Sequence, residues 1–454
     1  MRQSTLNFTE GKILLPLLRF VLPVLFALFL QALYGAIDLL VVGKFAGPED
    51  VSAVSTGSKI MMTITNLISS LAMGITIFLG QKVGEKDTKA GGRITGAGVF
   101  LFLTIGMVLT ILLPVLAGGL AALMHAPVEA FALTRTYIRI CGAGSIVIIL
   151  YNLIGSIFRS LGDSRTPLIT VLIACIFNIV GDLTLVAGFG LGAAGAALAT
   201  VLAQLLSVII SLFLIRRRGL PFAFAVSDIR PDGGIIRKIV SLGTPIALQD
   251  LLVGISFLVI LAIVNNLGLT ASAGIGVAEK VCAFIMLVPA AFMQALSAFV
   301  AQNRGAGKTD RAEKGLRYAV SVSFVFGVLM FVLTFFHGDL LSYIFANDAD
   351  VIYASWDYLK AYAIDCLLTC FLFCFIGFFN GMECTRFVML QGIIGAFAVR
   401  VPVSFLMSTL EPVSLFHIGL ATPCSTVLQI ILCLLFYRRL RKKGILPHEV
   451  MVAK

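Results

Sequence analysis

The stretch ACIFNIVGDLTLVAGF, residues 174–189, has the composition of a membrane span, yet it contains Asn178 and Asp182. An ionisable side chain at the centre of a bilayer costs at least about 2.5 kcal/mol. Residues four apart share one face of a helix, so the amide and the carboxyl group are expected side by side. A membrane helix that keeps such a pair is a candidate site for binding an ion or a proton.

The composition of the whole chain agrees with a membrane setting. Of the 454 residues, 59% are hydrophobic and only 13% are charged, and the mean hydropathy is +1.03. A soluble globular protein is about 45–50% apolar and about 25% charged. The nine cysteines lie almost entirely in apolar runs, which argues against a secreted disulfide framework.

Long apolar runs predict an all-α integral membrane protein with twelve transmembrane helices. The predicted spans are 14–42, 53–80, 94–123, 131–158, 166–188, 193–215, 239–266, 272–301, 317–337, 353–380, 385–409 and 414–437. The basic and then apolar start of the chain has no small-residue cleavage site, so the first span is expected to be retained.

The basic residues predict the orientation of these spans. Most of the 34 Lys and Arg fall on one side, whereas the opposite loops hold only Lys44. The basic segments are the N-terminus, 81–93, 158–167, 216–238, 302–317, Arg386 and the tail. The positive-inside rule then places both termini in the cytoplasm. The net charge of +11 is thereby interpreted as a topology signal, and no nucleic-acid partner is expected.

An internal repeat with a period of 221 residues relates the two halves of the chain. At this offset Lys59 matches Lys280 and Gln81 matches Gln302. The period covers six spans, an even number, so the halves are expected to run parallel about a pseudo-twofold axis along the membrane normal. Two six-helix bundles around a central cavity suit alternating access, which favours a transporter over a channel.

The repeat also predicts the domain organisation. The predicted parts are an N-terminal six-helix lobe at 1–215, a cytoplasmic linker at 216–238, a C-terminal six-helix lobe at 239–437 and a cytoplasmic tail at 438–454.

Polar groups within the spans are the candidate functional residues. Beside Asn178 and Asp182, the first half offers Asp38, Thr200 and Asn152. Carboxylate, amide and hydroxyl oxygens suit Na⁺ or a proton rather than a thiophilic metal. Neutralising a buried carboxylate would lower its burial cost and can bias a bistable helix arrangement.

The sequence gives little support for ATP binding, dinucleotide binding or metal binding. The chain has no Walker A motif, and its glycine-rich segment GFGLGAAG (188–195) joins two membrane helices. That segment is interpreted as a tight turn with a close helix contact, not as a dinucleotide fingerprint. Cys366, Cys370 and Cys374 share one helix face and are interpreted as small packing residues. No catalytic residue and no cofactor is expected, apart from Na⁺ as a candidate coupling ion.

The motifs resemble those of the multidrug and toxic compound extrusion (MATE) family, and of its bacterial drug-efflux branch in particular. The resemblance covers nearly the whole chain. It is carried by YGAIDLLVVGKFAG (34–47), YNLIGSIFRSLGDSRTP (151–167), NIVGDLTLV (178–186), GAAGAALATVLAQ (192–204), PIALQDLLV (245–253) and the segment 271–307.

The resemblance implies a fold and a function. It implies a V-shaped pair of lobes in the bacterial cytoplasmic membrane. It also implies export of organic, often cationic and amphipathic, compounds in exchange for inward Na⁺ or H⁺, by a chain expected to be a monomer in lipid. The coupling residues carried over by position are Asp38, Asn178, Asp182, Thr200 and Asn152, with Tyr137 as a weaker transfer.

The second half departs from the family pattern. Some members carry a Glu eight residues after the proline of span 7, where this chain has Val253. A second cation site of that form is therefore not expected. Gln249, Asp250 and Asp365, together with Tyr137 of the first half, are the weaker candidates for the substrate cavity.

Two alternatives to drug export remain open at this point. A flippase for lipid or lipid-linked saccharide, from the same superfamily, would need a cationic central cavity. A non-transporting receptor or ion channel would conduct or signal without a transported substrate. The sequence does not decide between Na⁺ and H⁺, because the same oxygen groups serve both.

Overall fold

The computed structural model describes residues 6–446 and is helical throughout its regular structure in that range. Within these residues, eleven helices are long and apolar enough to cross a membrane. The bent pair α4 (Val128–Ala143) and α5 (Ser145–Ser160), which meet at 52°, provides the twelfth span. The predicted all-α fold with twelve spans is confirmed.

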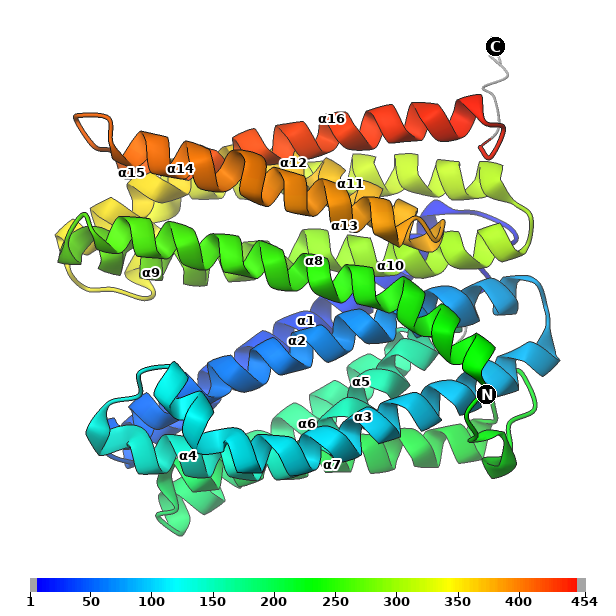
Figure 1. Ribbon diagram of the computed structural model, residues 1–454, viewed down its shortest axis with the longest axis horizontal. Coiled ribbons are helices and arrows are strands. Elements are labelled where there is room, and N and C mark those ends of the chain that lie inside the picture. The colour runs from blue at the N-terminus through cyan, green and yellow to red at the C-terminus, as the bar shows by residue number, and fades with distance from the viewer. Residues whose placement is uncertain (1–5, 447–454) are drawn as a thin grey trace. The chain divides into compact units, whose positions relative to one another are not determined.

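The helices divide between two compact units. Unit 1 holds α1 (Leu14–Phe45) from Leu22 onward, α2 (Pro48–Gly84), α3 (Thr88–Leu123), α4, α5, α6 (Arg165–Asp182), the π-helix η1 (Leu183–Gly188), α7 (Gly192–Arg218) and the short 3-10 helix η2 (Val226–Asp228). Figure 1 labels most of these elements. Within the unit, α6 packs along α7, and α2 packs against α4 and α5.

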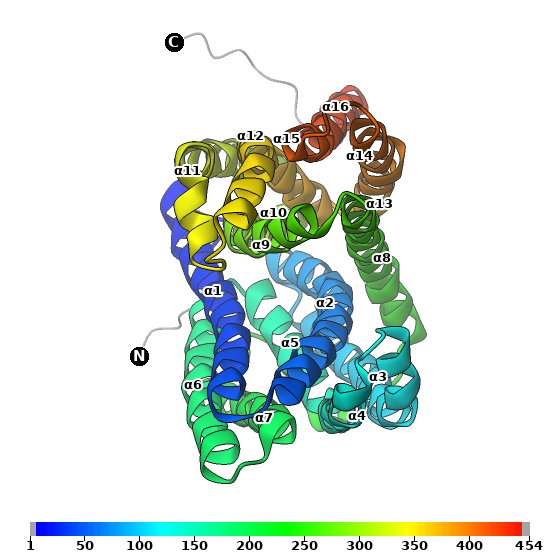
Figure 2. The same cartoon turned by 90° about the vertical axis from the view of Figure 1, so that its left-hand side faces the viewer.

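Unit 2 contains the second set of spans. It holds α8 (Gly233–Asn265) from Leu248 onward, α9 (Leu269–Ile285), α10 (Leu287–Gly305), α11 (Thr309–Tyr343), α12 (Ala349–Gly381), α13 (Thr385–Ile394), the π-helix η3 (Gly395–Arg400), α14 (Val401–Ser408), α15 (Leu415–Gly419) and α16 (Ala421–Lys442). Helix α12 is central to this unit and packs against α9, α10, α11 and α16 (Figures 1 and 2).

The two units divide the chain differently from the predicted lobes. The first residues of α1 belong to unit 2, and α8 belongs to unit 1 as far as Ala247. Most of the predicted linker 216–238 packs on unit 1, because Phe222 is buried there against Gly91 and Arg93 forms an ion pair of 2.6 Å with Asp232. In the predicted tail, residues 438–442 continue α16, and residues 447–454 lie outside the described part of the chain.

Glycines allow the helices of unit 1 to approach closely. A Cβ atom at Gly74 on α2 would lie 2.5 Å from the carbonyl oxygen of Ile239 on α8. Membrane helices associate through close packing rather than through a hydrophobic driving force, so small residues at such crossings set the interaxial distance.

The glycine-rich segment 188–195 forms a turn, as predicted. Gly190 and Gly192 have φ angles of +68° and +51°, a region that residues with a Cβ atom rarely adopt. Asp50 completes the turn, because its Oδ1 accepts a hydrogen bond of 2.7 Å from the amide of Ala193 in the first turn of α7. The turn reverses the chain so that α7 returns alongside α6.

Candidate cation-binding site

The site in unit 1 is centred on Asp38, in the second half of α1. Asp38 is only 5% exposed. Thr200 on α7 donates a hydrogen bond of 3.2 Å from its Oγ1 to Oδ2 of Asp38. The other carboxylate oxygen, Oδ1, has no hydrogen-bond partner among the described residues.

Asn178 and Asp182 face Asp38 from α6, and both are fully buried. Their interaction with Asp38 does not reach hydrogen-bond geometry. Both oxygens of Asp182 and both polar atoms of Asn178 are without a hydrogen-bond partner within residues 6–446. Buried polar groups are nearly always bonded, so this concentration of unpaired oxygens makes the cluster a candidate ligand site. Four free oxygens and the Thr200 hydroxyl form a donor set of the hard type that Na⁺ or a proton requires.

The sequence around Asp182 determines where α6 ends and how closely it approaches α7. Helix α6 ends at Asp182, and the π-helical turn η1 follows directly. π-Helical turns occur often at functional sites. Gly181 lets α6 approach α7, since a Cβ atom there would lie 3.1 Å from the Cβ of Ala199. That close approach brings the acidic face of α6 beside Thr200.

Two tyrosines line the site. Tyr137 on α4 is 3% exposed and interacts with Asp38 and with Tyr34. Tyr34 on α1 accepts a hydrogen bond of 3.2 Å from Nε2 of Gln204 on α7. Sequence analysis did not select Tyr34 or Gln204. The signal was present, because Tyr34 precedes Asp38 by four residues and Gln204 follows Thr200 by four, so each lies on the same helix face as its neighbour.

Asn152 is placed differently from the other predicted coupling residues. It lies half-buried on α5, and its Nδ2 donates a hydrogen bond of 2.8 Å to the carbonyl oxygen of Ile148. Its amide nitrogen is therefore engaged within its own helix, while Asp38, Asn178, Asp182 and Thr200 converge.

The charge at this site is uncompensated within the protein. The groups that interact with Asp38 and Asp182 are carboxyl, hydroxyl, amide, phenol and thiol groups. Within the described part of the chain, neither carboxyl group has a Lys, Arg or His nitrogen within 4.0 Å. Two neighbouring buried carboxylates repel each other, so the pair requires either a bound cation or a shared proton.

The secondary candidates in unit 2 have different surroundings. Gln249 on α8 is 8% exposed and packs against Gly392, where a Cβ atom would lie 2.8 Å from the Gln249 Cγ. The neighbouring Asp250 is exposed. Asp365 on α12 is 2% exposed and interacts with Arg400 of η3.

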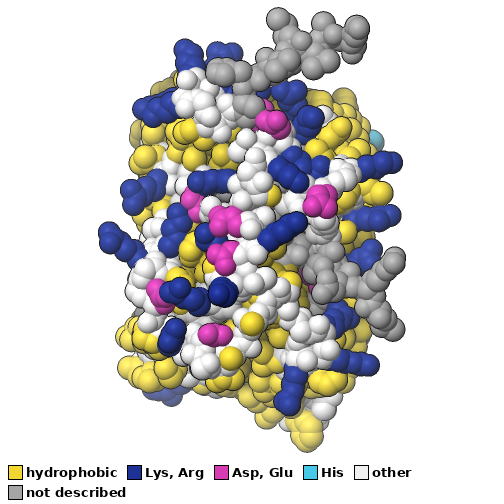
Figure 3. Space-filling model, turned by 90° about the vertical axis from the view of Figure 1, so that its right-hand side faces the viewer, with side chains coloured by type: hydrophobic (Ala, Val, Ile, Leu, Met, Phe, Trp, Pro, Cys, Tyr) yellow, Lys and Arg dark blue, Asp and Glu magenta, His cyan; other side chains and the backbone are white. Residues whose placement is uncertain are grey.

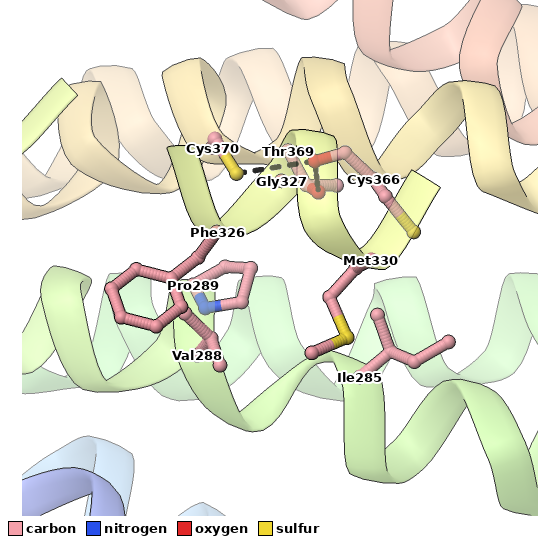
Figure 4. Close-up of a pocket in the computed structure, with 9 residues that line it drawn as sticks. All are labelled: Ile285, Val288, Pro289, Phe326, Gly327, Met330, Cys366, Thr369 and Cys370. Atoms are coloured by element: carbon pink, nitrogen blue, oxygen red, sulfur yellow. Dashed lines mark hydrogen bonds between the residues drawn. The ribbon is translucent and has the colours of Figure 1, made fainter. Parts of the chain in front are cut away.

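A small pocket of about 10 Å³ is lined in part by Cys366, which follows Asp365 on α12, and the pocket is apolar (Figure 4). Its lining is Ile285, Val288, Pro289, Phe326, Gly327, Met330, Cys366, Thr369 and Cys370. Its polar side chains bond to their own helix, since Thr369 donates to the Asp365 carbonyl at 2.8 Å and Cys370 to the Cys366 carbonyl at 3.1 Å. Within residues 6–446 no group of three or more His, Cys, Asp or Glu is arranged to hold a metal ion. Cys366, Cys370 and Cys374 are buried.

Comparison with known proteins identifies the family. The MatE family profile matches residues 23–184 and 245–406. The chain belongs to the MATE family of multidrug efflux transporters. The two matched segments start 222 residues apart, within one residue of the 221-residue period found in the sequence. This MATE transporter is therefore built from two homologous halves, as the repeat predicted.

Relatives of this MATE chain are similar over nearly their whole length. The probable multidrug resistance protein YoeA of Bacillus subtilis is 24% identical, over 93% of each chain. The multidrug export protein MepA of Staphylococcus saprophyticus is 23% identical, over 89% of each chain.

Solved MATE structures share its fold. A MATE crystal structure in complex with MaD3S superposes with a TM-score of 0.90 at 20% identity, covering 96% of this chain and 99% of that one. An outward-facing multidrug resistance transporter of the family has a TM-score of 0.89, also at 20% identity, covering 96% and 98%. The chain is thus a multi-pass membrane transporter, and the family's activity is transport rather than catalysis.

Proposed function

We propose that this MATE transporter is a secondary active antiporter. It exports organic, cationic and amphipathic compounds from the cell in exchange for inward H⁺ or Na⁺. The observation that supports the proposal is the pair of buried carboxyl groups, Asp38 and Asp182, with three free oxygens and no basic partner among the described residues. A transporter driven by a cation gradient needs a site whose charge changes when the cation leaves, and this pair meets that requirement.

Charge at the pair would couple the cation to helix movement. With a proton or Na⁺ bound, α1, α6 and α7 can keep Asp38, Asp182 and Thr200 together. When the cation leaves, two carboxylates face each other where little water can screen them, which favours a different helix arrangement. A cationic compound prefers the ionised state of the protein, so cation and compound would bind alternately.

The proposed setting is the bacterial cytoplasmic membrane, with both termini on the cytoplasmic side. Figure 3 shows a face with many Lys and Arg side chains. Exposed basic residues include Lys86 between α2 and α3, Lys89 in the first turn of α3 and Arg218 at the end of α7. Basic loops favour the cytoplasmic side. We propose a monomer as the transporting unit, with lipid and small organic substrates as its partners.

The proposal can be tested with purified protein in proteoliposomes. Movement of ethidium, a fluorescent organic cation, is measured while a Na⁺ gradient and a pH gradient are imposed separately. One of the two gradients is expected to drive wild-type transport. Asp182→Asn should abolish that driven component, whereas Asp87→Asn, at an exposed helix cap, should transport like the wild type. Unchanged gradient-driven transport by Asp182→Asn would refute the mechanism. Movement of a fluorescent lipid without ethidium transport would support the flippase alternative instead.

A further inference from the structure

A polar stripe runs along the exposed side of α2 in unit 1. Its exposed polar members are Lys59, Thr63 and Asn66, which recur at the three- and four-residue spacing of one helix face. Asn66 is the middle residue of α2 (Pro48–Gly84), so it lies about 27 Å along the helix from either end. The stripe therefore reaches the middle of a helix that is long and apolar enough to span a membrane.

The neighbouring helix α3, which packs against α2, has a different exposed surface. Between residues 107 and 116 its exposed side chains are all apolar, as expected of a surface that faces lipid: Met107, Val108, Ile111, Leu112, Val115 and Leu116. Charged and polar side chains of membrane helices face protein or water, because hydrocarbon leaves their hydrogen bonds unsatisfied. The exposed side of α2 from Lys59 to Asn66 is thus assigned to water rather than to lipid.

Two groups of the stripe are free to bind a ligand. Within the described part of the chain, the ammonium group of Lys59 and the amide group of Asn66 form no hydrogen bond and no ion pair. The hydroxyl of Thr63 is engaged in its own helix, since it donates a hydrogen bond of 2.9 Å to the carbonyl oxygen of Lys59. An ammonium group offers only donors, and its strongest hydrogen bonds are those to anionic acceptors such as a carboxylate.

The homologous half lacks this arrangement. At the 221-residue offset, the hydroxyl and amide positions are occupied by Phe284 and Leu287, and only Lys280 is retained. The Nζ of Lys280 lies 5.9 Å from the centre of the Phe345 ring, and that ring stacks on Phe284 with 6.4 Å between centres. A cation–π contact at this distance engages the ammonium group of Lys280. Of the two repeat-related lysines, the one in unit 1 is therefore the one with a free ammonium group.

We propose that Lys59 determines substrate specificity by binding a carboxylate of the transported compound, with Asn66 as a second donor on the same stripe. The preferred substrates are then zwitterionic amphiphiles, in which an organic cation also carries an acidic group. A cation without an acidic group is repelled by the charge of Lys59, whereas a carboxylate gains a charge-assisted hydrogen bond. This role rests on the proposed export function, to which it adds a class of substrate.

The test uses two dyes that differ in one group. Tetramethylrhodamine has a cationic ring system and a free carboxylate, and its methyl ester lacks that negative charge. Binding of each dye to purified protein in a non-ionic detergent is measured by fluorescence polarisation at neutral pH. No ion gradient is present, so the measurement does not depend on transport. The readout is the ratio of the two Kd values.

Replacing Lys59 should change this ratio. Lys59→Gln should weaken the binding of tetramethylrhodamine by about five-fold, as for one charged contact at a partly solvated position, and should leave the methyl ester within about two-fold. Lys59→Arg keeps the charge and should bind both dyes like the wild type. Lys59 is exposed, so its replacement should leave the Tm nearly unchanged. Asn66→Leu should shift the ratio in the same direction, and it decides the question if Lys59→Gln does not fold.

Two other lysines provide matched controls. Lys280→Gln removes the ammonium group at the repeat-related position, and Lys89→Gln removes an exposed one from the first turn of α3. Both variants should leave the ratio of Kd values unchanged, because neither lysine lies on the polar stripe. A shift as large as that of Lys59→Gln would show that net charge sets the preference, and would overturn the proposal.

Other outcomes would also overturn it. One is a wild type that does not bind tetramethylrhodamine. Another is a Lys59→Gln variant with an unchanged ratio, as expected of a lysine that only extends toward lipid headgroups. Equal weakening of both dyes would indicate a structural role for Lys59 and would contradict the specificity. Failure of gradient-driven ethidium transport would refute the antiport proposal and leave these binding ratios unaffected.

Discussion

Thr200 on α7 donates a hydrogen bond of 3.2 Å to Asp38 on α1, although 162 residues separate them in the sequence. The hydroxyl satisfies one carboxylate oxygen, and the other, Oδ1, has no hydrogen-bond partner among the described residues. One helical turn away, Gln204 on α7 bonds to Tyr34 on α1 at the same 3.2 Å. These two contacts fix α1 against α7 in register, and with it the position of the carboxyl group.

Replacing Thr200 should weaken cation coupling. Thr200→Val keeps the shape of the side chain but removes the donor, so Asp38 loses its one hydrogen bond. A hydrogen bond to a charged group contributes about 1.5–3 kcal/mol, which corresponds to a loss of about 10-fold or more in apparent cation affinity. The measurement is the cation concentration at half-maximal ethidium transport. Thr200→Ser keeps the hydroxyl and should stay within about two-fold of the wild type. Equal values for the valine and serine variants would contradict this role.

The stability of the protein should depend on cations through the carboxyl pair. Wild-type protein in detergent should gain Tm as Na⁺ or protons are added, because a ligand that binds the folded state stabilises it. Asp182→Asn removes one of two facing buried charges. We expect it to raise the Tm in the absence of the coupling cation by about 2–4 °C and to abolish the cation dependence. Asp348→Asn, at the exposed cap of α12, should keep that dependence. A Tm response unchanged in Asp182→Asn would exclude the pair as the binding site.

The close contact between α2 and α8 should not tolerate an added methyl group. A Cβ atom at Gly74 would lie 2.5 Å from the Ile239 carbonyl oxygen, which is backbone and cannot swing aside. Gly74→Ala should destabilise unit 1 by about 1–3 kcal/mol, seen as a lower Tm. Gly35→Ala on α1 is the matched control, because its Cβ atom would meet nothing within 4 Å. If both variants unfold at the same temperature, the inferred close packing of α2 against α8 is contradicted.

The ion pair at the start of α8 should give a pH-dependent contribution to stability. Hydrogen bonding to Arg93 holds the pKa of Asp232 below its ordinary value of 3.8. A carboxyl group with a depressed pKa in the folded state contributes stability above its unfolded pKa and loses it as the pH falls through the folded one. Asp232→Asn should therefore lower the Tm slightly at neutral pH, and the difference from the wild type should vanish below about pH 3.

The control for the pH experiment is Arg93→Gln, which removes the partner of the same ion pair. Its Tm difference from the wild type should shrink over the same acidic range. If the Tm difference between Asp232→Asn and the wild type grew as the pH fell, the ion pair with Arg93 would not be the source of the stability.

Much of the fold could be predicted because the constraints that a membrane imposes on the backbone act on short segments of the chain. Backbone groups in lipid must form hydrogen bonds within the protein, so a long apolar run is expected to form an α-helix. The break within the fourth span, between α4 and α5 near Gly144, was not predicted. It depends on packing at that point, and one glycine among 43 gives no distinct signal.

The candidate site was predictable in part, for a similar reason. Asn178 and Asp182 stood out because they are polar, adjacent on one helix face and surrounded by apolar residues. Tyr34 and Gln204 did not stand out, since tyrosine and glutamine are common at helix ends and lack a charge. Arg400 was visible in the sequence as a basic residue within a span, but its contact with Ser256 depends on a helix that is distant along the chain.

The sequence by itself determined the all-helical membrane fold, the parallel repeat and the acidic residues that need compensation. These follow from hydropathy, from period and from the cost of charge in lipid, all of which are properties of short segments. Only the tertiary structure decided which charge each acid meets. Asp38 meets Thr200 and Asp182, because close crossings such as that of Gly181 with Ala199 bring together helices that are distant along the chain.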